Sequence, residues 1–290
     1  MSKLAFVDTH VHFWGLQHPE LAYSWLQPDF LHPQIGQLLD GLKGKNYLAE
    51  DFIAETRGEN VTKAVHVQAA LGIEDPVQES AWLTEAAERT GFPHAIVAYS
   101  NLKKPDVGEE LARHCKFSRV KGIRDFSEGD YLVDPDFQRG YALLERFNLV
   151  ASLDVEWEGM EKLRGLTRKY PNVIAVLDHC GFPKQRTEEY FQHWKQGMTT
   201  LAESENVVCK ISGLGMCDWQ WTVESIRPWV LHCIEAFGPE RCMFGTNWPV
   251  DKLFSTYDVL IEAYTEIVAD FSQDEQIAMF SGNAERLYGI

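Results

Sequence analysis

Eight short runs of apolar and largely β-branched residues recur along the chain, and each run predicts a β-strand. Most of the runs are continuous rather than alternating, which is typical of strands that are covered on both faces. They occupy residues 4–10, 61–68, 93–100, 119–125, 149–156, 173–180, 207–213 and 241–247. The first expectation is therefore a parallel sheet with helices outside it.

Helical patterns fill the intervals between these runs. In residues 137–147, and again in residues 191–201, large apolar side chains recur at steps of three and four, which places them on one face of a helix. Strand and helix thus alternate eight times, and this alternation predicts a single (β/α)8 TIM barrel. A doubly wound open sheet is the alternative, but no GxGxxG sequence follows any of the eight runs.

The interval after the first predicted strand differs from the others. Residues 13–58 show no helical period and contain several prolines, tryptophans and histidines, among them Trp14, Trp25 and His32. We expect a long loop that folds over one mouth of the barrel. No linker or internal repeat interrupts the chain, so residues 1–290 are expected to form one domain.

Composition and charge narrow the class of protein. Hydrophobic residues make up 45% of the chain, enough to bury a large core, and the formal net charge is −16. Such an acidic surface repels phosphate backbones and anionic lipid, so neither nucleic acid nor a membrane is expected as a partner. No apolar run approaches the roughly 18 residues of a membrane-spanning helix, and the N-terminus does not read as a signal peptide. The six scattered cysteines predict reduced thiols and a cytoplasmic protein, with a homo-oligomer allowed.

Candidate chemistry begins with the sequence His10-Val11-His12 at the end of the first predicted strand. Side chains alternate along a strand, so both imidazoles point the same way, here into the barrel mouth. TIM-barrel enzymes keep their active sites at this C-terminal end of the strands. Two neutral imidazoles on one face can bind a divalent metal, and the alternative is a pair of hydrogen-bonded histidines.

Polar residues also end several of the other predicted strands. Because these strand ends meet at one mouth, their side chains are expected to converge there. By contrast, Asp178 is expected to face the helix layer, and Asp8 to lie deeper than His10. The residues expected at the mouth are Arg124, Asp154, His179, Lys210 and Asn247, with Asp251 just beyond.

Three motifs in order, VDTHVHFW, VLDHCGFPK and MFGTNWPVDK, lie at the first, sixth and eighth predicted strands. Together they resemble the amidohydrolase superfamily, and specifically its amidohydrolase-2 branch, which contains proteins similar to 2-pyrone-4,6-dicarboxylate lactonase and the sugar lactonases. The resemblance spans essentially the whole chain. It implies a distorted TIM barrel, hydrolysis of the ester bond of a small-molecule lactone, and a site built from His10, His12 and His179. It also implies that Arg124 binds substrate or polarises the carbonyl.

One departure from the family pattern concerns the general base. Superfamily members with a full metal site carry an aspartate at the end of strand eight, where this chain has Asn247, and an amide cannot accept a proton at neutral pH. Another carboxylate is therefore needed. Asp251 is the first choice, because the intervening turn could bring it over the mouth, and Asp154 is the second. Asp8 and Asp178 rank lower.

The metal content expected from the resemblance is one divalent ion, zinc, or none, because some relatives in this branch work without one. Bound zinc would have His10, His12 and His179 as ligands and would lower the pKa of its water to about 7. Without a metal, His179 and Arg124 could stabilise the oxyanion while a carboxylate accepts the proton from water. No GxSxG occurs, so an acyl-enzyme route is not expected.

The same mouth should bind the substrate. Tryptophan faces suit the C–H faces of a sugar ring, which favours a sugar-derived or otherwise compact lactone, carboxylated or not. His66 could bind a hydroxyl or carboxylate, but a core histidine is an equal alternative. The substrate-binding residues predicted from sequence are Trp14, His66, Gln68, Arg124, Lys184, Asn247 and Trp248.

Two other functions stay open at this point. The same branch contains zinc-dependent non-oxidative decarboxylases of aromatic acids, although those relatives generally keep the strand-eight aspartate that Asn247 replaces. A catalytically inactive barrel that binds a ligand is the other alternative, and it would leave three histidines and an arginine at one mouth unexplained.

Overall fold

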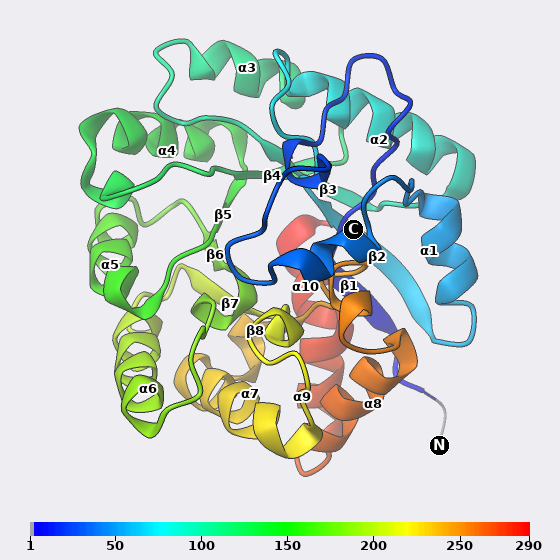
Figure 1. Cartoon of the computed structure of the whole chain (residues 1–290). Helices are drawn as coiled ribbons and strands as arrows, with labels where there is room; N and C mark the ends of the chain where they lie inside the picture. The colour runs from blue at the N-terminus through cyan, green and yellow to red at the C-terminus, as the bar shows by residue number, and fades with distance from the viewer. Residues whose placement is uncertain (1–2) are drawn as a thin grey trace.

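Eight parallel strands form one sheet in the computed structural model, which describes residues 3–290 (Figure 1). The sheet order follows the sequence from β1 to β8. The strands are β1 (Phe6–Val11), β2 (Val61–Val67), β3 (Ala95–Tyr99), β4 (Val120–Arg124), β5 (Val150–Leu153), β6 (Ala175–Leu177), β7 (Val207–Ile211) and β8 (Cys242–Phe244). All eight predicted runs contain a strand, and the predicted TIM barrel is confirmed.

The barrel closes between β8 and β1 by a narrow contact. The backbone N–H of His12 donates to the carbonyl of Trp248 at 2.8 Å, and Val11 forms an isolated parallel bridge with Trp248. No longer ladder joins these two strands among the described residues. The end of β1 is therefore tied directly to the loop after β8, which brings two of the three family motifs together.

Most of the helices surround the sheet, and their buried faces match the apolar stripes of the sequence (Figure 1). In α4, Phe137, Tyr141 and Leu144 are fully buried, and in α6 Trp194 and Met198 are. The helices are α1 (Ala49–Glu55), α2 (Val77–Thr90), α3 (Val107–His114), α4 (Pro135–Phe147), α5 (Met160–Lys169), α6 (Glu188–Ala202), α7 (Val223–Phe237), α8 (Tyr257–Ile267), α9 (Gln273–Ile277) and α10 (Asn283–Tyr288). No helix in the described part of the chain is long and apolar enough to cross a membrane.

The segment 13–48, which we call the strap, crosses the mouth of the barrel (Figure 1). On one side of the mouth, the Trp25 indole N–H donates to the carbonyl of Ala69, just beyond β2, at 2.7 Å. On the other side of the mouth, a short 3-10 helix of the strap, Gln37–Gly41, contacts the 3-10 helix Asp251–Leu253 that follows β8. The expected loop over 13–58 is thus shorter than predicted, because α1 begins at Ala49.

The chain turns sharply after β6. The strand ends at Leu177, two residues before His179, and four consecutive residues from His179 to Phe182 have positive φ angles of 53°, 55°, 68° and 51°. Gly213 makes room for this turn, since a Cβ there would lie 2.4 Å from His179 Nδ1. The left-handed segment therefore presents His179 to the barrel mouth from a tight turn rather than from a strand.

Candidate active site

Three histidines lie together at the C-terminal end of the barrel. The ring centroids of His10 and His12 are 4.9 Å apart, and those of His10 and His179 are 4.4 Å apart. The His12 Nδ1–H donates to the carbonyl of Val67 at 2.8 Å, and His179 Nδ1 lies 2.9 Å from the Ser212 hydroxyl. The two strand-one imidazoles and the turn after β6 thus meet, as the sequence predicted.

All three rings are held in the neutral form. Burial lowers the pKa of His12 to about 3 and that of His179 to about 4. Burial also lowers the pKa of His10 well below its usual value, with His179 and the nearby Lys210 adding to the effect. Neutral imidazoles can accept or donate hydrogen bonds, but rings with such low pKa values are weak bases for removing a proton from water.

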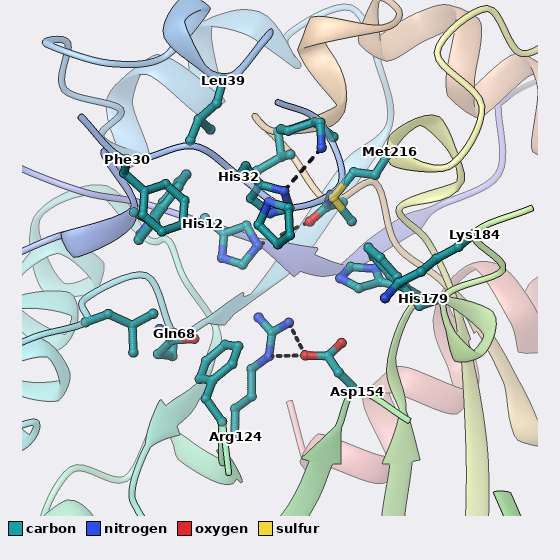
Figure 2. Close-up of a pocket in the computed structure, with 18 of the residues that line it drawn as sticks. His12, Phe30, His32, Leu39, Gln68, Arg124, Asp154, His179, Lys184 and Met216 are labelled. Atoms are coloured by element: carbon teal, nitrogen blue, oxygen red, sulfur yellow. Dashed lines mark hydrogen bonds and ion pairs between the residues drawn. The ribbon is translucent and has the colours of Figure 1, made fainter. Parts of the chain in front are cut away.

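Arg124 and Asp154 form an ion pair beside the histidines (Figure 2). Asp154 Oδ2 accepts from Arg124 Nη2 at 2.6 Å and from Nε at 3.1 Å. The guanidinium lies over the ring of Phe126, with its Cζ 4.7 Å from the ring centroid. Asp154 Oδ1 has no hydrogen-bond partner among the described residues and is itself sealed from solvent, although the side chain as a whole is 32% exposed. The pair therefore presents a fixed positive charge and a partly exposed carboxylate to the barrel mouth.

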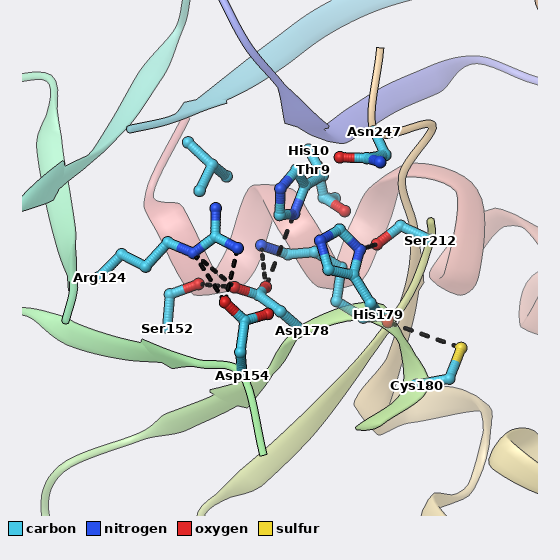
Figure 3. Close-up of polar contacts among 12 residues, drawn as sticks. Thr9, His10, Arg124, Ser152, Asp154, Asp178, His179, Cys180, Ser212 and Asn247 are labelled. Atoms are coloured by element: carbon cyan, nitrogen blue, oxygen red, sulfur yellow. Dashed lines mark hydrogen bonds and ion pairs between the residues drawn. The ribbon is translucent and has the colours of Figure 1, made fainter. Parts of the chain in front are cut away.

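A second, deeper ion pair joins Lys210 to Asp178 inside the barrel, and Figure 3 shows Asp178 close to Ser152 and Asp154. Lys210 Nζ lies 2.8 Å from Asp178 Oδ1, and both side chains are fully buried. The Ser152 hydroxyl donates to Asp178 Oδ2 at 2.6 Å, and His10 Nδ1 lies 3.7 Å from Oδ1. Although burial opposes ionisation, Lys210 and His10 hold the pKa of Asp178 well below its usual range. The expectation that Asp178 faces the helix layer is wrong, because β6 ends at Leu177 and the following turn directs this carboxylate inward.

Asn247 connects His12 to Asp251. Its Oδ1 lies 3.2 Å from His12 Nε2, and its amide Nδ2 donates to Asp251 Oδ1 at 2.8 Å. Asp251 is buried, accepts a weak bond from the Gly215 N–H at 3.4 Å, and does not line the cavity. The expectation that Asp251 reaches over the mouth is wrong, because the 3-10 helix Asp251–Leu253 fixes it behind Asn247.

Burial raises the pKa of Asp251 to about 7, which makes folding stability depend on pH. The fold favours the protonated carboxyl, so this contribution is complete below about pH 4 and is lost as the pH rises through 7. We expect Asp251→Asn, which is neutral at every pH, to gain in melting temperature relative to the wild type between pH 5 and pH 8. If thermal melts show the same difference in melting temperature between the two proteins at every pH in this range, the raised pKa of Asp251 would be contradicted.

A cavity of about 480 Å³ opens above these groups, between the strand ends and the strap (Figure 2). Of the predicted site residues outside the histidines, Arg124, Asp154, Gln68, Lys184 and Asn247 line it. The full lining consists of His12, Trp25, Phe30, His32, Pro33, Ile35, Leu39, Gln68, Leu71, Arg124, Phe126, Glu128, Asp154, Glu156, His179, Phe182, Lys184, Met216, Asn247 and Val250.

Three predicted substrate-binding residues lie elsewhere. The indole N–H of buried Trp14 donates to the Lys45 carbonyl, and that of buried Trp248 donates to Glu55, so both tryptophans anchor the strap and α1. His66 is a core histidine, with Nδ1 accepting from the Phe13 N–H at 3.1 Å. Their predicted placement in the substrate site is wrong, because each ring is buried outside the cavity lining and already has a hydrogen-bond partner within the protein.

Sequence reasoning left the contribution of the strap to the cavity unassigned. Trp25, Phe30 and His32 stand in the long interval that was noted for its aromatic and histidine content, but no periodicity there shows which of them point inward. The acidic Glu128 and Glu156 were also missed. They follow β4 and β5 by a few residues, and that position was the available signal.

The fit of a metal ion depends on whether the donors converge. No group of three His, Cys, Asp or Glu side chains among residues 3–290 is arranged to hold an ion. Both ring nitrogens of His10 lack a hydrogen-bond partner among the described residues, but both nitrogens of His12 and one of His179 are already hydrogen-bonded. The ammonium of Lys210 is close enough to depress the pKa of His10, and it would also repel a divalent cation. The side chains as placed do not form a ligand set, so we derive no chemical step through a metal.

Comparison with known proteins finds relatives that match nearly the whole chain. An uncharacterised protein of Sinorhizobium fredii is 38% identical over the full length of both chains. An L-fucono-1,5-lactonase of Burkholderia multivorans is 26% identical, with 98% of this chain and 96% of the relative covered. A crystal structure of an amidohydrolase from Burkholderia multivorans with bound zinc has a TM-score of 0.84 at 26% identity, covering 98% of this chain and 99% of that one.

The family assignment rests on the whole chain rather than on one motif. The family model described as amidohydrolase, Amidohydro_2, matches residues 7–290, which include all of the barrel strands except the first residue of β1, together with the three motifs. The chain therefore belongs to the amidohydrolase family.

Proposed function

We propose that this protein is a hydrolase that opens the ring of an uncharged sugar lactone by attack of water on the carbonyl carbon. The observation that supports it most is the Arg124–Asp154 pair, which lines the cavity at the barrel mouth beside His179. The similarity to an L-fucono-1,5-lactonase over nearly the whole chain supports the reaction class.

The pair offers the two groups that lactone hydrolysis needs. Negative charge develops on the carbonyl oxygen as water attacks, and the Arg124 guanidinium is a fixed positive charge that can stabilise it. Asp154 lines the cavity with a partly exposed carboxylate, so it can accept the proton of the attacking water and return it to the ring oxygen as the C–O bond of the lactone breaks. With Asp251 behind Asn247, Asp154 becomes the first choice for the general base.

The charges around the cavity favour an uncharged substrate. Of its two cations, Arg124 is paired with Asp154, and Lys184 Nζ lies 2.6 Å from Glu156 Oε1. Glu128 adds a third carboxylate to the lining. A dicarboxylated lactone would have to break these pairs, whereas the hydroxyls of a sugar lactone can hydrogen-bond to them. Phe30, Phe126 and Phe182 provide apolar surface for C–H groups.

A lactone panel read by proton release with a pH indicator tests this proposal. Uncharged five- and six-membered sugar lactones should be hydrolysed with higher kcat/KM than a dicarboxylated lactone such as 2-pyrone-4,6-dicarboxylate. An aromatic carboxylic acid, followed by carbon dioxide release, tests the decarboxylase alternative. Turnover of that acid with no turnover of any lactone would overturn the proposal, and tight ligand binding without turnover would favour the inactive barrel.

We expect the activity to survive removal of divalent metal ions, although a relative binds zinc. The reason is that Arg124 already supplies positive charge at the cavity, and His10, His12 and His179 do not converge as ligands. The measurement compares initial rates before and after exhaustive chelation, with metal content determined by elemental analysis. Loss of activity that added zinc restores in the wild type, but not in His10→Ala or His179→Ala, would show instead that these histidines hold a required metal.

A further inference from the structure

One histidine of the strap, His32, lines the cavity but takes no part in the chemistry described above. His32 lies in a turn that is stabilised by hydrogen bonds to the backbone and side chain of His32 itself. The His32 carbonyl accepts from the Gly36 N–H at 2.9 Å, and Gly36 has a φ of 56°. Lys43 Nζ donates to the Phe30 carbonyl at 2.7 Å and so ties the segment before the turn to the segment after it. His32 is thus carried by a preformed part of the strap.

The ring of His32 is held in one tautomer. Its Nδ1 accepts from the backbone N–H groups of Gln34 at 3.1 Å and Ile35 at 3.3 Å. A nitrogen that accepts hydrogen bonds cannot carry the proton of a neutral imidazole, so the proton is on Nε2. Partial burial lowers the pKa of His32, which also keeps the ring neutral. Nε2 has no hydrogen-bond partner among the described residues, and it is not sealed from solvent.

This N–H is the polar group that the strap side chains offer to the cavity. The other strap residues in the lining are aromatic or aliphatic, and the indole N–H of Trp25 is already bonded to the Ala69 carbonyl. Figure 2 shows His32 on the strap side of the cavity, with Arg124 and Asp154 on the opposite side. A hydroxylated ring bound between them would meet apolar surface on the strap side everywhere except at His32.

We propose that His32 is a substrate-binding residue that donates a hydrogen bond from Nε2–H to a hydroxyl oxygen of the sugar lactone. This proposal rests on the proposed function. The bond fixes which hydroxyl of the ring faces the strap, and it therefore sets the orientation in which the carbonyl meets Arg124. Sugar lactones that differ only in the configuration or presence of that hydroxyl are distinguished by His32.

The test uses two substitutions that separate the two nitrogens of the ring. In His32→Asn, the side-chain oxygen can replace Nδ1 as the acceptor for the turn, because asparagine commonly caps such turns, but the Nε2 donor is lost. In His32→Gln, the amide N–H₂ can reach the position of Nε2. His18 provides a matched control, because its Nδ1 also accepts a backbone N–H, from Glu20 at 3.3 Å, but it lies outside the cavity lining.

With the best sugar lactone, we expect His32→Asn to raise KM roughly 3- to 10-fold with little change in kcat, the scale of one neutral hydrogen bond. His32→Gln should recover part of this loss, and His18→Asn should match the wild type. Among single-deoxy analogues of the lactone, the one that lacks the bonded hydroxyl should have a higher KM than the parent lactone with the wild type. With His32→Asn, the KM values of this analogue and of the parent lactone should be similar. An unchanged KM in a folded His32→Asn would overturn the proposal, and so would a fall in kcat at constant KM, which would place His32 at the reacting atoms.

Binding of a sugar lactam, a ring that resists hydrolysis, keeps this test independent of turnover. Titration calorimetry should show weaker lactam binding by His32→Asn than by the wild type. If the wild type binds the lactam in a His32-dependent way but opens no lactone, the proposed function fails and the role of His32 stands. If lactone turnover is present but lactam affinity and KM do not depend on His32, only the present inference fails.

Discussion

Asp154→Asn is expected to lower kcat for the best lactone by about 10²- to 10⁴-fold, the usual contribution of a general base. Asparagine has the shape of aspartate, and its carbonyl can still accept hydrogen bonds from Arg124, but it cannot take a proton from water. KM should change much less than kcat, because the substitution removes the proton acceptor and leaves the shape of the cavity. Steady-state kinetics by proton release measures both constants.

Glu156→Gln is the matched control for this substitution. Glu156 stands two residues further along the same loop, also lines the cavity and also holds a cation, Lys184, but it lies outside the Arg124–Asp154 pair. We expect its kcat to stay close to that of the wild type. Equal losses in the two variants would show that any change of cavity charge impairs the enzyme, and near-normal kcat in Asp154→Asn would remove Asp154 as the base.

Lys210→Met is expected to lower the free energy of unfolding by about 3–5 kcal/mol, the cost of leaving one partner of a buried ion pair without the other. Asp178 would remain buried as a carboxylate, with the Ser152 hydroxyl and, at longer range, His10 Nδ1 at 3.7 Å and Arg124 Nε at 3.8 Å as its remaining partners. The side chain of methionine fills most of the volume of lysine, so a packing defect contributes little. Urea denaturation measures the loss.

Two further variants show whether the charge causes this loss. The double variant Lys210→Met with Asp178→Asn removes both charges and should be less destabilised than Lys210→Met alone. On the surface, Lys162 lies 2.5 Å from Asp130 with both side chains exposed, and Lys162→Met should cost no more than about 1 kcal/mol. If Lys210→Met costs no more than Lys162→Met, the Lys210–Asp178 pair does not stabilise the fold.

The barrel and much of the mouth could be predicted from the sequence because strand periodicity is a local property. Continuous apolar runs mark strands covered on both faces, and alternation then places His10 and His12 on the same side. The same rule places Arg124 at the end of β4, and Asp154 follows β5 directly. These are the residues whose position depends only on the strand that precedes them.

Positions set by loops could not be predicted in this way. Asp178 follows β6 by one residue, but the left-handed turn that begins at His179 directs its side chain to Lys210 instead of the helices. Trp14 and Trp248 follow strand ends as closely as the true lining residues do, yet their indoles bond to groups on the strap and α1. The direction of these side chains depends on contacts between segments far apart in the sequence, and the periodicity of a sequence carries no information on such contacts.

The most direct test of the account is the hydrolysis of a single uncharged six-carbon sugar lactone, such as L-fucono-1,5-lactone, by the wild-type protein. Proton release is followed at one pH with substrate in large excess, and the spontaneous rate is subtracted. We expect saturable turnover that is proportional to the wild-type concentration and is lost in Asp154→Asn protein that remains folded. Rates equal to the spontaneous reaction for this lactone and its isomers, from a folded wild-type protein, would contradict it.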